Sequence, residues 1–280
     1  GDLGVLDRPI LRDPTIIKKA DYVIMESTYG NRLHPENATS IEQLLDIVIK
    51  TTRRGGTVVI PSFAVGRTQE LIYEFNRFYL ERPEYKDELE KLTVYIDSPM
   101  ATSATEVFRR NAQVFDEETK AYILKGDNPL DFPNLRFTRS TAESQALNMD
   151  RKPKIIISAS GMCEAGRIKH HLKHNLWKPE NTILFVGYQA VGTLGRRLLE
   201  GANYVTLFGE SVKVAAQIRQ LQGMSGHADQ KGLELWIQHV QQVKKVFVIH
   251  GETTAADTFT ALLNEQGISA YAPYSGTEFD

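Results

Sequence analysis

The chain has 280 residues, of which 41% are hydrophobic and 24% charged, and its formal net charge is −2. This composition is typical of a folded globular protein and excludes neither an enzyme nor a binding module, but it argues against a disordered chain or a uniformly positive surface. The longest apolar runs fall well short of the roughly 20 residues that a membrane-spanning helix needs, so we expect a cytoplasmic protein with no membrane partner.

Short β-branched runs alternate with amphipathic helical patterns along the chain, and small or polar residues separate them. This alternation predicts an α/β fold with a mainly parallel sheet flanked by helices. In chain order, the predicted strands are residues 22–26, 57–61, 93–97, 154–158, 182–186 and 245–250. Functional groups are expected where these strands end, because helix N-termini meet the same edge of a parallel sheet.

The single cysteine, Cys163, limits the metal chemistry that the chain can support. It cannot form an internal disulfide, and it excludes a zinc site built from several thiolates. Any metal must therefore be held by histidine and carboxylate side chains.

Four residues of this type, Asp2, Glu26, His227 and His250, lie at predicted strand ends or in glycine-flanked turns. A carboxylate and an imidazole suit zinc or manganese. A carboxylate hydrogen-bonded to a second imidazole makes a pair that can deliver a proton to a leaving oxygen. From spacing alone, a residue such as each of these four is more often a structural polar group than a functional one.

A set of motifs spans nearly the whole chain in the order GD, ESTYG, PSFAVGRTQEL, YIDSPMA, SASGM, AGR, GYQAVGTLG, SGHAD and VIHGE. This set resembles the metallo-β-lactamase superfamily with a β-CASP insert, in its prokaryotic RNA-processing branch. The resemblance implies a β-CASP domain over residues 31–223. It assigns residues 1–30 and 224–280 to an incomplete metallo-β-lactamase αβ layer. The implied activity is a metal-dependent ribonuclease that hydrolyses RNA phosphodiester bonds in RNA processing or degradation.

The resemblance also implies roles for individual residues. Asp2 becomes the carboxylate that bridges two zinc ions, and His250 becomes the distal imidazole ligand. The two ions activate a water for in-line attack on phosphorus. Glu26 orients His227, which protonates the departing 3′ oxygen, because an alkoxide leaves poorly near neutral pH without an acid.

RNA phosphates have candidate partners in Arg67, after PSFAVG, and Arg167, after SASGMCEAG. Both guanidiniums follow glycine turns at predicted helix N-termini, where anions bind favourably. The resemblance adds Ser225, Gly226 and His227 as phosphate contacts. For Arg67, an ion pair with Glu70 is the alternative.

The family's HxHxDH cluster and a further histidine would precede the GD segment and are not in this sequence. None of the remaining histidines stands in such a context: His34, His170, His171, His174 and His239. We therefore expect an incomplete and inactive piece of a longer parent, which binds zinc poorly because two ligands rarely hold the ion. Such a piece would expose an apolar face, so we also consider a homodimer.

Three alternatives stay open. The first is a non-catalytic RNA-binding or scaffolding subunit of the same family. The second is hydrolysis of another phosphoester or of a thioester, because the fold does not determine the reaction. The third concerns residues 167–174, RIKHHLKH, which predict a basic helix face toward either nucleic acid or solvent rather than a metal site.

Overall fold

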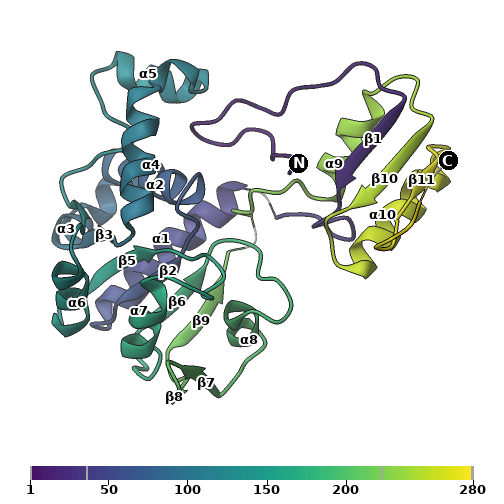
Figure 1. Cartoon of the computed structure of the whole chain (residues 1–280). Coiled ribbons are helices and arrows are strands. Elements are labelled where there is room, and N and C mark those ends of the chain that lie inside the picture. Colours follow the sequence, from purple (N-terminus) through teal and green to yellow (C-terminus); the bar gives the residue numbers. More distant parts are fainter. Residues whose placement is uncertain (1, 36, 222, 279–280) are drawn as a thin grey trace. The chain divides into compact units, whose positions relative to one another are not determined.

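Figure 1 shows a computed structural model of the chain, which describes residues 2–35, 37–221 and 223–278. The chain divides into two units. Unit 1 comprises Gly1–Pro35 and Ser225–Asp280, and unit 2 comprises Glu36–Met224. Among the described residues, no helix combines the length and the apolar character that crossing a membrane requires.

Unit 2 is built on a six-stranded sheet with the strand order β4-β3-β5-β2-β6-β9, in which all neighbouring strands run parallel. The strands are β2 (Val58–Pro61), β3 (Thr93–Ile96), β4 (Leu135–Phe137), β5 (Lys154–Ser158), β6 (Thr182–Phe185) and β9 (Gln217–Gln220). The central strands β2, β5 and β6 are buried at every position. Continuous burial is what a parallel sheet covered on both faces requires.

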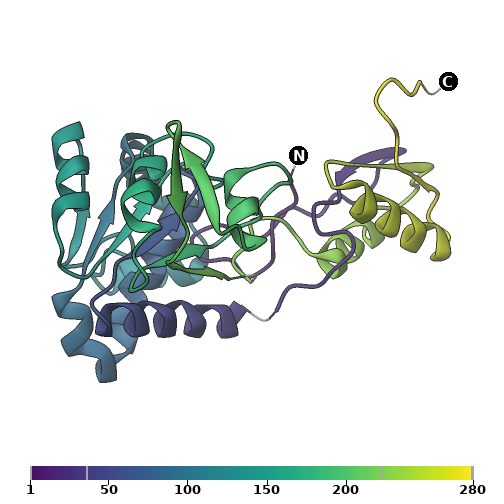
Figure 2. The same ribbon diagram turned by 90° about the horizontal axis from the view of Figure 1, so that it is seen from below.

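Helices flank this sheet (Figures 1 and 2). They are α1 (Asn37–Arg53), α2 (Arg67–Glu81), α3 (Lys86–Lys91), α4 (Pro99–Arg110), α5 (Glu117–Leu124), α6 (Thr141–Met149), α7 (Ile168–Asn175) and α8 (Leu194–Leu199), with short 3₁₀ turns at Pro83–Tyr85 and Ala112–Val114. Local sequence sets several starts. Ser98 caps α4 ahead of Pro99, and Ser140 forms a capping box with Glu143 at α6. A small antiparallel hairpin, β7 (Tyr204–Leu207) with β8 (Glu210–Lys213), completes the unit.

Unit 1 contains a three-stranded parallel sheet with the order β1-β10-β11, made of β1 (Tyr22–Glu26), β10 (Lys245–Ile249) and β11 (Ala270–Tyr271). Helices α9 (Gln230–Gln238) and α10 (Thr253–Glu265) pack on one face of it. Alternate strand residues such as Val23 and Val248 are buried there, whereas Tyr22 and Ile24 on the other face are exposed. The period-two pattern thus gives this sheet one covered and one open apolar face.

The sequence correctly predicts a mainly parallel α/β architecture, and each of its six strands is present with ends that shift by no more than one residue. It misses the hairpin strands β7 and β8 and the strands β4, β9 and β11, each of which has two to four residues. Strand β9 reads QIRQ and carries one apolar residue, while β4 and β11 have three and two residues. The alternation of apolar and polar residues can be recognised only over several residues, so these strands are defined by their pairing with neighbouring strands and not by their sequence.

Candidate functional site

The site in unit 1 begins where β1 and β10 end side by side. These strands pair in parallel with Glu26 opposite Ile249, so the ESTYG and VIHGE turns start at the same level. Ser27 links the turns: its backbone N–H donates to the His250 carbonyl (3.2 Å) and its Oγ donates to the Ile249 carbonyl (3.0 Å). A Cβ on Gly251 would lie 2.4 Å from Ser27 Oγ, so only glycine permits this approach.

His250 follows β10 directly and adopts a left-handed backbone with φ of 51°. This conformation is uncommon for a residue with a side chain and is often found at functional sites. Its imidazole is 58% exposed, and its Nδ1 lies 3.3 Å from Thr28 Oγ1. The turn therefore presents the imidazole outward instead of packing it in the core.

The N-terminal segment reaches this place through the backbone of Leu3. Its N–H donates to Glu26 Oε1 (2.6 Å), and its carbonyl accepts from the N–H of Ala228 (2.9 Å). Leu3 thereby lies between the end of β1 and the SGHAD turn. As a result, Asp2 stands beside His227.

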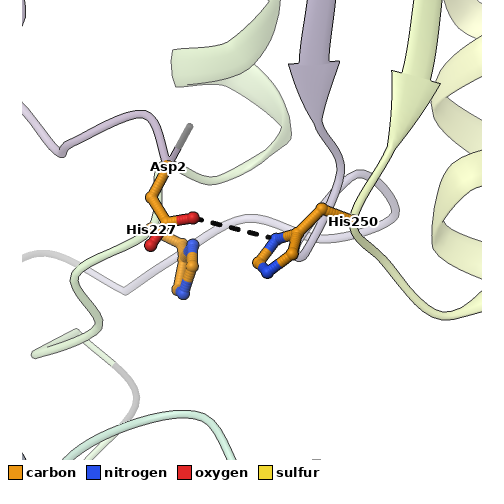
Figure 3. A group of neighbouring side chains, drawn as sticks. All are labelled: Asp2, His227 and His250. Carbon is orange, nitrogen blue, oxygen red and sulfur yellow. Dashed lines mark ion pairs between the residues drawn. The ribbon is translucent and has the colours of Figure 1, made fainter.

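Asp2, His227 and His250 converge, as Figure 3 shows. Each offers one ligand atom, and these atoms lie within 4.8 Å of one another; Asp2 Oδ1 is 3.9 Å from His250 Nδ1. Asp2 and His250 offer a carboxylate and an imidazole, donors that zinc prefers, while His227, whose Nδ1 faces Glu26, stands beside them. The residues present therefore fit a catalytic divalent metal.

Glu26 and His227 form the predicted carboxylate–imidazole pair. Glu26 Oε2 lies 2.8 Å from His227 Nδ1, with the carboxylate 1% and the imidazole 22% exposed. Burial alone would raise the pKa of Glu26, but hydrogen bonds from His227, Thr28 and the Leu3 amide outweigh it, so the pKa lies below its ordinary value. An ionised Glu26 accepts a hydrogen bond from Nδ1–H of His227, which fixes the orientation of the imidazole.

His34 supports the backbone of His227. Its Nε2 donates to the His227 carbonyl (3.0 Å), and its own N–H donates to Asp229 Oδ2 (2.9 Å). The ring also packs edge-on against Tyr29, with centroids 4.5 Å apart. Burial lowers the pKa of His34, which favours the neutral ring that makes these contacts.

The SGHAD turn combines exposed and structural residues. Gly226 is exposed, whereas Ser225 is buried, with its Oγ accepting from the His227 N–H (3.3 Å) and its carbonyl accepting from Arg8 Nη2 (2.6 Å). Asp229 caps α9 by accepting from the Gly232 N–H (2.8 Å). The cap fixes where the helix starts and hence where His227 sits.

The two predicted phosphate-binding arginines lie in unit 2 and differ in their surroundings. Arg67 pairs with Glu70 on the first turn of α2, and both side chains are about nine-tenths buried, at 8% and 10% exposed. This is the alternative that the sequence offered for Arg67. Arg167 is 20% exposed, and its Nη1 donates to the buried Asp97 (2.6 Å).

The glycine motifs around Arg167 interlock. Gln189 Nε2 donates to the Gly161 carbonyl (3.0 Å), and the Gly195 N–H donates to the Met162 carbonyl (3.2 Å). The Leu194 N–H donates to Glu164 Oε1 (2.5 Å). Hydrogen bonds between GYQAVGTLG and SASGMCEAGR therefore hold the loop that precedes α7.

Sequence reasoning did not identify Thr28 or His34 as members of the network in unit 1. In unit 2 it did not identify Asp97 or the buried His171, whose Nε2 lies 2.5 Å from Asp97 Oδ2. Thr28 and Asp97 lie inside quoted motifs, ESTYG and YIDSPMA, which was a signal for both. His34 and His171 carried no local signal, because their partners are 193 and 74 residues away in sequence.

Two family models match the chain: the Beta-Casp domain over residues 68–198, and the Zn-dependent metallo-hydrolase RNA specificity domain over residues 211–273. The chain belongs to the β-CASP family of the metallo-β-lactamase superfamily. The β-CASP match falls within unit 2 and includes Asp97 and Arg167, and the second match includes His227 and His250. The name of the second model supports a metal cofactor.

Curated relatives of this β-CASP protein include proteins named as ribonucleases. It is 38% identical to Ribonuclease TTHA0252 of Thermus thermophilus, over 90% of this chain and 56% of the relative. It is 30% identical to an RNase J-like protein of Methanocaldococcus jannaschii, over 99% of this chain and 63% of the relative. It is 32% identical to the transcription termination factor FttA of the same organism, over 91% and 42%. The chain thus spans about half the length of these relatives.

Proposed function

We propose that the whole protein is a cytoplasmic, metal-dependent ribonuclease that hydrolyses RNA phosphodiester bonds in RNA processing or degradation. The observation that carries this proposal is the convergence of Asp2, His227 and His250 within 4.8 Å, with Glu26 behind His227. These four residues come from segments more than 20 residues apart. A shared position for all four is expected of a reaction site and is rare for unrelated surface groups.

In this proposal, Asp2 and His250 would be protein ligands of two zinc ions. The exposure of both side chains, 63% and 58%, leaves them accessible to metal and substrate. Zinc, when bound, supplies Lewis acidity toward a phosphoryl oxygen. The hydrogen bond from Leu3 to Glu26 keeps Asp2 at the site before any ligand arrives.

His227 acts as the general acid. Glu26 holds Nδ1 and stabilises the protonated ring, so Nε2 can donate its proton to the departing 3′ oxygen. Proton delivery to a leaving oxygen contributes roughly 10²- to 10⁴-fold to such reactions. Without Glu26 the ring would lose both its orientation and its counter-charge.

RNA is the proposed partner of both units. In unit 1, the exposed Gly226 and the imidazole of His227 offer donors to a phosphate, while Ser225 shapes the turn. In unit 2, Arg167 and Arg67 are the proposed cations, and Arg67 would have to share its guanidinium between Glu70 and a phosphate. Homodimer formation also stays a proposal, since Tyr22 and Ile24 on the open sheet face are side chains that a second copy would bury.

The test uses the whole protein with a 5′-labelled single-stranded RNA and zinc. Cleavage should vanish with a chelator, return with zinc, and fall at least a hundredfold in Asp2→Asn, because the amide cannot replace a charged ligand. Lys244→Ala, an exposed change in the same unit, should retain cleavage. Binding without any cleavage would instead favour the non-catalytic RNA-binding subunit.

A further inference from the structure

A second polar cluster lies in unit 2 around Asp97, which directly follows β3. The Asp97 N–H donates to the Ile157 carbonyl of β5 (2.8 Å), so the residue continues the sheet pairing at the carboxyl ends of these strands. Its side chain is fully buried. An ionised carboxylate in such a position requires several donors.

Those donors come from three segments: the turn after β4, helix α6, and α7 with its N-cap Arg167. Oδ1 accepts from Thr138, after β4, and from Arg167 Nη1 (2.6 Å); Oδ2 accepts from Ser144 of α6 (2.6 Å) and His171 Nε2 of α7 (2.5 Å). Burial would raise the pKa of Asp97, but the hydrogen bonds from His171, Ser144 and Thr138 hold it well below its usual range. The carboxylate therefore stays charged and maintains its ion pair with Arg167.

Arg167 is the member of this cluster that reaches the surface. Asp97 and Thr138 engage Nη1, and Nη2 lies 3.5 Å from the Arg139 carbonyl, while the side chain is 20% exposed. A guanidinium has five N–H donors in a fixed plane, so contacts at Nη1 and Nη2 orient its remaining donors. An arginine held in this way loses little rotamer freedom when it meets an anion.

His171 ties the cluster to α7. It is fully buried, with Nε2 on Asp97 and Nδ1 2.9 Å from Asn148 Oδ1 of α6. The prediction of a basic face for residues 167–174 thus does not extend to this ring, which points into the core. Both ring nitrogens are engaged, so Asp97 cannot rotate away from Arg167 without breaking contacts to two helices.

We propose that Asp97 and His171 are positioning residues, which fix the guanidinium of Arg167 so that its outer edge binds an RNA phosphate. This inference rests on the proposed RNA contact of Arg167. Neither Asp97 nor His171 touches RNA; both act through the arginine.

The experiment measures binding of a fluorescent single-stranded RNA to the full chain by anisotropy, over a series of salt concentrations. Arg167→Ala should weaken binding on the order of tenfold and reduce the salt slope by about 0.7, the value of one phosphate on a single strand. Asp97→Asn should weaken binding in the native background and have no further effect when combined with Arg167→Ala. Equal effects of Asp97→Asn in both backgrounds would overturn the positioning role.

Ser144→Ala is the matched control, because it removes one hydrogen bond to Asp97 Oδ2 on the side away from Arg167. It should lower thermal stability and leave the salt slope unchanged. If Asp97→Asn does not fold, two variants of His171 replace it in the test. His171→Gln keeps a donor toward Asp97 and should retain RNA affinity, whereas His171→Leu lacks that donor and should lose RNA affinity. Equal affinity of these two variants would contradict the proposal. An unchanged salt slope in Arg167→Ala would instead remove the RNA contact itself.

Discussion

The two units each contain a carboxylate paired with an imidazole, in different settings. In unit 1, Glu26 and His227 lie 2.8 Å apart and the imidazole is 22% exposed. In unit 2, Asp97 and His171 lie 2.5 Å apart and both are fully buried. The hydrogen bond is nearly the same, so the pair itself does not distinguish a reaction site from a structural one.

The surroundings make the difference. His227 Nδ1 faces Glu26, and its partly exposed ring stands beside the exposed Asp2 and His250, where a metal and a substrate have access. His171 has both nitrogens engaged inside the unit. The first pair is therefore arranged for proton transfer, and the second for holding a fold and the arginine next to it.

The largest expected effect is on catalysis at the exposed pair. His227→Ala in the whole protein should slow single-turnover cleavage of single-stranded RNA by roughly 10²- to 10⁴-fold, because the variant lacks the proposed proton donor to the leaving oxygen. The free energy of unfolding should change little, since the ring is partly exposed. His239→Ala, at the exposed end of α9, is the control and should cleave normally. Equal cleavage rates for the two variants would contradict the role of His227 as the general acid.

The buried pair should respond in the opposite way. His171→Leu should lower the free energy of unfolding of unit 2 by about 3–5 kcal/mol, because it leaves the Asp97 carboxylate buried without one of its donors. Urea unfolding can be followed for this unit alone. Trp177 lies in unit 2 and Trp236 in unit 1, so a Trp236→Phe background reports unit 2 by fluorescence. A loss below about 1 kcal/mol, the median for exposed pairs, would contradict the assignment.

Glu74 of α2 is another buried carboxyl group, and unlike Asp97 it has few hydrogen-bond donors around it. Glu74 is fully buried, Arg77 lies 3.4 Å from its Oε2, and within the described chain its Oε1 has no hydrogen-bond partner. Burial raises the pKa of Glu74 to about 7. Its folded pKa thus exceeds the ordinary value of 4.5, so stability is fully present below pH 4.5 and is lost as the pH rises through 7.

The free energy of unfolding of unit 2 should therefore fall by up to about 3 kcal/mol between pH 5 and pH 8. Glu74→Gln should flatten this dependence, since the amide does not ionise, and Glu84→Gln, on an exposed turn, should not. Urea titrations at each pH give the result. A slope that persists in Glu74→Gln would assign the titration to another group.

The order of motifs was enough to identify the family and to name Asp2, Glu26, His227 and His250 together. The sequence could not supply Thr28, His34 or Leu3 as their supports, because each acts through contacts to residues 23 or more positions away. The sequence also predicted the same role, binding of an RNA phosphate, for Arg67 and for Arg167. The structure separates them by burial and by partner, with Glu70 beside the first and Asp97 beside the second.

The sequence by itself determined the α/β class, the six main strands and the chemical types available at their ends, because periodicity and turn residues act locally along the chain. Tertiary structure alone decided which imidazole faces solvent and which lies in the core. His227 and His171 have similar chemistry and neighbouring carboxylates, but exposure depends on the helices that pack around them. That packing is set by long-range contacts which no local pattern records.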